Sequence, residues 1–89
     1  MPRFQSPSEL RQCVLDIAAE IEFSGLAEAT ALLRYGANFP ATTGTEWLGE
    51  LALAEEKVRD RFTLPAGTRE PLSLVLKTAR SDRPYGGWH

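Results

Sequence analysis

Histidine and cysteine are almost absent from this chain of 89 residues: the one histidine is His89, its last residue, and the one cysteine is Cys13. A single cysteine cannot form an internal disulfide or a Cys-x-x-Cys motif. Without an internal histidine, the chain lacks the Ser/His/Asp and Cys/His sets of nucleophilic catalysis and the His-rich clusters that bind transition metals. We therefore expect a protein that is not an enzyme and that holds no metal and no cofactor.

Long apolar runs are also missing. The longest ones, such as residues 51–54, are far shorter than the roughly 20 residues that cross a bilayer as a helix. The first residues lack the basic, apolar and small-residue order of a secretory signal. We expect a cytoplasmic protein, of a bacterial type, with no membrane partner.

The composition is that of an ordinary globular protein, with 43% hydrophobic and 25% charged residues. This length encloses a single hydrophobic core, so we expect one domain over residues 1–89. A domain this small leaves much of its surface in water, and a homodimer would bury more of it.

The net charge of −2 is unevenly distributed along the sequence. Residues 1–56 contain nine acidic and three basic side chains, whereas residues 57–89 contain seven basic and three acidic ones. Either the two halves pack together and neutralise each other, or they form a surface of two signs for a partner. The basic residues do not share one helix face and Asp60 interrupts them, so we expect no nucleic-acid partner.

Apolar residues at helical spacing predict an all-α fold, a small four-helix domain with a surface aromatic loop and an irregular C-terminal tail. The expected helices cover about residues 7–24, 26–35, 45–62 and 69–80, and the tail covers residues 81–89. Ser6, Pro7 and Glu9 form the pattern of a capping box at the first helix. Gly25 and Gly36 are expected to end the first and second helices.

The third helix is the expected spine of the domain. Thr43 or Thr45 can cap its start, and Trp47 begins its apolar stripe. Glu55 and Arg59 lie four residues apart, in the order that favours an ion pair on a helix surface.

The last segment is ambiguous. Thr68 is a plausible cap for a helix with Pro71 in its first turn. However, Leu72, Leu74 and Leu76 also alternate as in a strand, so residues 70–80 are either helix, which we favour, or strand.

Cys13 lies on the apolar stripe of the first helix, where a thiol usually packs as a small hydrophobe. The aromatic residues gather in two places, a loop region with Tyr35, Phe39 and Trp47 and a tail with Tyr85 and Trp88. Such side chains serve in recognition, since they supply large contact areas at low entropic cost. The alternative is that they cover the open ends of the core.

Carboxylates are the only abundant reactive groups. Asp16 and Glu20, like Glu46 and Glu50, are four residues apart, so each pair shares a helix face. Such faces are usually solvated. Our main functional hypothesis is a small protein-binding accessory protein, such as an immunity-like or antitoxin-like inhibitor of a basic partner. The acidic residues that would bind this partner are Glu9, Asp16, Glu20, Glu46 and Glu50.

Two other functions compete with this hypothesis. The first is a self-assembling structural homo-oligomer in which Leu53, Phe39 and Trp88 bury one another. The second is a small-ligand or metal-binding protein that uses the carboxylates and Tyr35 around a pocket between helices. No motif in the chain is specific enough to decide among the three.

Overall fold

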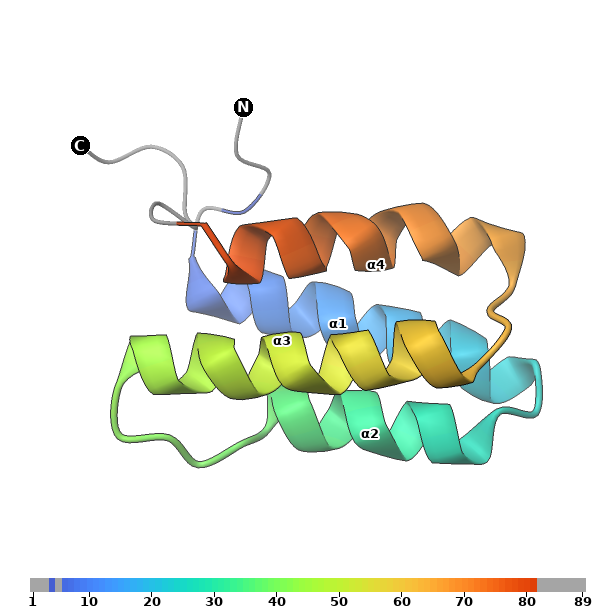
Figure 1. Ribbon diagram of the computed structural model, residues 1–89, viewed down its shortest axis with the longest axis horizontal. Helices are drawn as coiled ribbons and strands as arrows, with labels where there is room; N and C mark the ends of the chain where they lie inside the picture. The colour runs from blue at the N-terminus through green and yellow to red at the C-terminus, as the bar shows by residue number, and fades with distance from the viewer. Residues whose placement is uncertain (1–3, 5, 82–89) are drawn as a thin grey trace.

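Four α-helices and no strand make up the part of the chain that the computed structural model describes, namely Phe4 and residues 6–81. The helices are α1 (Pro7–Phe23), α2 (Ala27–Ala37), α3 (Gly44–Arg61) and α4 (Ala66–Ala79). Each runs antiparallel to the helix before it (Figure 1). The expected all-α fold is confirmed. None of the four helices is long and apolar enough to span a bilayer.

The helices form a closed ring in which α1 contacts α2, α2 contacts α3, α3 contacts α4, and α4 contacts α1. The backbones of the diagonal pairs, α1 with α3 and α2 with α4, do not approach each other closely. The apolar stripe of each helix faces the centre. The largest fully buried apolar side chains are Leu10, Val14, Ile21, Leu33, Leu51, Val58 and Val75. Because α1 and α3 lie on a diagonal, their outer faces do not form a continuous surface.

The ends of α1 follow from local sequence. Ser6 is the N-cap, and its Oγ accepts a hydrogen bond of 3.3 Å from the Glu9 backbone N–H. After the last turn Gly25 adopts a φ of 85°, a left-handed conformation that glycine adopts without strain. The N–H groups of Gly25 and Leu26 then bond to carbonyls of the last turn, which reverses the chain into α2.

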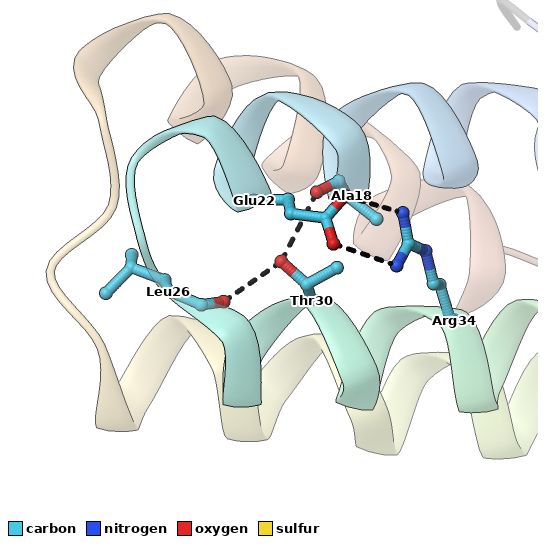
Figure 2. A network of polar contacts seen from close by, with 5 residues as sticks. All are labelled: Ala18, Glu22, Leu26, Thr30 and Arg34. Atoms are coloured by element: carbon cyan, nitrogen blue, oxygen red, sulfur yellow. Dashed lines mark hydrogen bonds and ion pairs between the residues drawn. The ribbon is translucent and has the colours of Figure 1, made fainter.

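Polar contacts join α1 to α2 (Figure 2). The buried Thr30 hydroxyl lies 2.9 Å from the Leu26 carbonyl oxygen of its own helix and 3.4 Å from the Ala18 carbonyl oxygen of α1. At the surface, the Arg34 guanidinium pairs with the Glu22 carboxylate, with Nη2 3.0 Å from Oε1. These contacts hold α1 and α2 together, both in the core and at the surface.

Gly36 does not end α2, contrary to the sequence-based expectation; the helix continues through Ala37. A Cβ atom on Gly36 would lie 2.8 Å from the Ala54 Cβ of α3, closer than two carbon atoms can pack. The glycine is needed here for the close approach of α2 and α3, and not for a turn.

The carbonyl of Ala37, at the C-terminal end of α2, connects three helices. It accepts one hydrogen bond from Trp47 Nε1 of α3 and another from Arg11 Nε of α1, both at 3.0 Å. The Arg11 guanidinium also lies 5.6 Å from the centre of the Trp47 ring. A cation at a helix C-terminus is favourable because carbonyl dipoles converge there.

The start of α4 differs from its prediction. The helix begins at Ala66, after Pro65, and Thr68 lies buried within its first turn instead of capping it. The Thr68 hydroxyl donates to the Pro65 carbonyl at 2.8 Å. Pro71 consequently lies inside the helix, where its missing N–H removes one intrahelical bond. Residues 70–79 are helical, so the strand alternative is wrong.

Candidate functional site

Two cavities open along α4, one on each of its sides. The first, of about 490 Å³, lies between α1 and α4. The second, of about 350 Å³, lies between α4, the end of α3 and the loop that joins them. Both volumes fall in or near the range of about 300–1,000 Å³ that is usual for ligand pockets. α4 therefore forms a wall of both candidate binding regions.

The first cavity is lined by apolar side chains and by carboxylates, and we call it the acidic groove. The carboxylates come from both helices, Glu9 and Asp16 from α1 and Glu70 from α4. Its other described lining residues are Phe4, Gln12, Cys13, Pro71 and Leu74. Among the described lining residues, none is basic, so this groove presents negative charge beside apolar surface.

The local geometry of α1 holds the groove's polar side chains in place. Gln12 Nε2 donates a hydrogen bond of 2.9 Å to Asp16 Oδ1, one helical turn away. Cys13 is half-buried and packs against the edge of the core. The sequence predicted a position on the apolar stripe of the first helix. The sequence singled out Glu9 and Asp16, but it gave no reason to place Glu70 beside them.

The structure does not bring the other predicted acidic residues to this groove. Glu20 is exposed one turn beyond Asp16 on α1. Glu46 stabilises the start of α3, because its Oε1 accepts from the Thr42 N–H while the Thr43 hydroxyl accepts from the Glu46 N–H, each at 3.0 Å. Glu50 lies half-buried on α3, diagonally across the bundle from α1.

The predicted apolar and aromatic contact residues are similarly scattered. Tyr35 is 59% exposed on α2 and packs edge-on against the half-buried Phe39, with ring centroids 5.8 Å apart. Leu53 is 52% exposed on α3. Tyr85 and Trp88 lie outside the described residues. Trp47, in contrast, is buried, so that part of the aromatic loop covers one end of the core.

The second cavity contains the most unusual group in the protein, the carboxyl of Glu55, and we call it the Glu55 cavity. Glu55 is 0% exposed, and neither of its carboxylate oxygens has a hydrogen-bond partner within the described chain. Two arginines, Arg59 and Arg69, also line the cavity, and both are exposed. The remaining described lining residues are Phe62, Thr63, Leu64, Leu72, Ser73 and Leu76.

Burial raises the pKa of the Glu55 carboxyl from its ordinary value of 4.5 to about 9, although the positive charge of Arg80 partly opposes this rise. The group is therefore a neutral carboxylic acid at pH 7. In that form it has one O–H donor and further acceptor capacity, with no partner for either in the described chain.

The predicted surface ion pair between Glu55 and Arg59 is wrong, because Glu55 is buried. Arg59 instead donates from Nε to the Oδ1 of Asp60, at 3.0 Å. A signal for burial was present: Glu55 follows Leu51 by four residues and precedes Val58 by three, so it belongs to the same helix face as both. The prediction relied on the charge of Glu55 and overlooked its place on the apolar face of the helix.

Two ion pairs connect the acidic half of the sequence to the basic half. Arg61 Nη2 lies 3.5 Å from Glu28 Oε2, and Arg80 pairs with Glu56. The pair of Arg61 and Glu28 is exposed, and such pairs contribute at most about 1 kcal/mol, whereas Glu56 of the other pair is half-buried. Among the described residues, no group of three His, Cys, Asp or Glu side chains could hold a metal ion.

No family model, curated protein or solved structure matches this chain.

Proposed function

We propose that this protein is a non-catalytic binding protein whose acidic groove accepts a basic, amphipathic segment of a partner protein. The observation that supports this proposal is the composition of the groove: carboxylates from two helices together with apolar side chains, and no basic side chain among its described lining residues. An immunity-like or antitoxin-like inhibitor of a basic partner is one protein of this kind.

The partner's chemistry follows from the groove. Leu74 and Pro71 provide the apolar surface against which a nonpolar side chain packs, and Asp16 and Glu70 provide negative charge at its sides. A segment with lysine or arginine flanking an apolar residue complements both features. Complementary charge at a rim mainly raises the association rate and depends on salt.

Affinity capture with matched charge-reversal variants tests this function. Asp16→Lys with Glu70→Lys reverses two charges in the groove, and Glu28→Lys with Asp60→Lys reverses two charges elsewhere. Wild type and control should retain the same stoichiometric partner, whereas the groove variant should lose it. The partner should also dissociate from the wild type as salt rises.

Retention of the same partner by the groove variant would disprove the proposal, as would the absence of any stoichiometric partner on the wild type. Circular dichroism of both double variants establishes that each is folded. Purified partner then allows the association rate to be measured directly, and the groove variant should lower it more than the control does.

A further inference from the structure

The Glu55 cavity has the features of a built binding site, and they are independent of the acidic groove. A protein interior rarely contains a carboxyl group without hydrogen-bond partners, because leaving such a group unsatisfied costs about 1–3 kcal/mol. Here Glu55, the residue that carries the unsatisfied group, lines a cavity of about 350 Å³. A guest molecule in that cavity can supply the missing hydrogen bonds.

The charged residues that line the cavity differ in exposure. Glu55 is wholly buried, whereas Arg59 and Arg69 are exposed, so we place Glu55 at the inner side of the cavity and the arginines at the side open to solvent. Leu64, Leu72 and other apolar side chains line the space with them. A molecule that fits this arrangement is polar at both ends and apolar between them.

The charges select an anion over a cation. Arg69 makes no ion pair with any described residue, and Arg59 uses only its Nε in the contact with Asp60. Two guanidinium groups therefore offer donors for a carboxylate at the open end. A cation would be repelled by both arginines and would find one carboxyl, which is neutral at pH 7. A single carboxyl beside two arginines is also a poor metal site.

We propose that the Glu55 cavity binds a small amphipathic organic anion. Its carboxylate lies at Arg59 and Arg69, its apolar body lies against the leucines, and a hydroxyl or amide group at its other end hydrogen-bonds with Glu55. Glu55 and Arg59 are four residues apart on α3, about 6 Å of helix rise, and the arginine side chain extends this distance outward. A medium-length chain spans it.

Three probes separate the contributions of the two ends. The ω-hydroxy derivative of octanoate has both end groups, octanoate has only the carboxylate, and octanediol has only hydroxyls. Binding is followed by two-dimensional NMR of the full chain, in which backbone amides report the location of the probe. The amides of Thr63, Leu64 and Ser73 should shift saturably.

The hydroxy acid should bind about tenfold more tightly than octanoate, because one buried neutral hydrogen bond has about that effect. Glu55→Leu should abolish this preference while octanoate still binds. Glu55→Gln keeps a donor and an acceptor and should restore part of the preference. These variants separate hydrogen bonding by Glu55 from its effect on folding.

The arginines are tested with a matched pair of double variants. Arg59→Gln with Arg69→Gln removes two charges from the cavity, and Arg61→Gln with Lys77→Gln removes two charges that do not line it. The cavity variant should weaken binding of both acids by at least tenfold and leave octanediol unaffected, because an arginine–carboxylate contact is charge-assisted. The control variant should bind all probes as the wild type does.

Any of three results would overturn the proposal: no saturable shift with the hydroxy acid, shifts confined to residues away from the cavity, or equal binding by the cavity and control variants. A preference for the hydroxy acid that remains in the Glu55→Leu variant would also overturn the proposal. None of these variants changes a described residue of the acidic groove, so failure of this proposal leaves the proposed protein-binding function untouched.

Discussion

The stability of this protein should fall as pH rises, because of one buried carboxyl. Burial raises the pKa of Glu55 to about 9 in the folded chain, whereas its ordinary value is 4.5. Between these two pH values the folded state holds a proton that the unfolded state has lost. The free energy of unfolding therefore decreases with pH over this interval, and the contribution is fully present only below the lower value.

The size of the effect follows from the shift. One pH unit corresponds to about 1.4 kcal/mol for each proton that differs between the two states. From pH 5 to pH 8 the wild type should therefore lose about 4 kcal/mol relative to a variant without this group. That is a large part of the 5–15 kcal/mol that is typical of a folded domain.

Glu55→Gln is the variant of choice, since it removes the titration and preserves the shape of the side chain. Urea unfolding followed by circular dichroism gives the free energy of unfolding for both proteins at several pH values. Subtracting one curve from the other removes the contributions of the titratable groups that both proteins share. Plotted against pH, that difference should slope by about 1.4 kcal/mol per unit.

Glu55→Leu provides an internal control. Leucine adds apolar burial, so its difference curve should be displaced from that of Glu55→Gln, but both must have the same slope because both lack the titrating group. A difference that stays flat from pH 5 to pH 8 for both variants would show that Glu55 is ionised in the folded protein and would refute the reasoning. The charge that favours the ionised form is Arg80, and burial outweighs it.

Three further substitutions test contacts in the fold by urea or thermal unfolding. Gly36→Ala should cost about 1–3 kcal/mol, since its Cβ would meet Ala54 at 2.8 Å, and adding Ala54→Gly should recover part of the loss. Trp47→Phe should cost about 1 kcal/mol or more, because the Ala37 carbonyl loses its indole donor. Thr43→Ala should cost about 1 kcal/mol, because the α3 amide that it caps loses its acceptor, whereas Thr43→Ser should cost less.

The fold was predictable because its signals are local. Ser6 and Thr43 cap helices with their own side chains, and Gly25 supplies the left-handed residue of a turn. Each of these roles depends on residues within about one helical turn, so the sequence around each position is sufficient to reveal it. The apolar stripes then determine which face of each helix packs inward.

The errors concern residues whose roles depend on a second helix. Gly36 has the same local pattern as a helix-ending glycine, but its role comes from Ala54 of α3. Thr68 is the exception, because its error is local: it has the pattern of a cap, but the helix begins at Ala66, after Pro65. The acidic groove was not predicted, for the same reason as with Gly36: the sequence grouped Asp16 with Glu20 on one helix face, whereas Glu70 joins Asp16 only through the packing of α4.

Packing alone does not explain why residue 55 is a glutamate. Its position on the apolar stripe of α3 would suit a leucine, which would avoid an unsatisfied buried carboxyl and its cost. Stability therefore does not account for a glutamate at this position. The carboxyl does account for the ligand selectivity that we propose for the cavity, since it supplies a neutral donor and acceptor in a lining that also contains two arginines. The residue that the sequence analysis placed on the surface is thus the one that carries the most specific functional information.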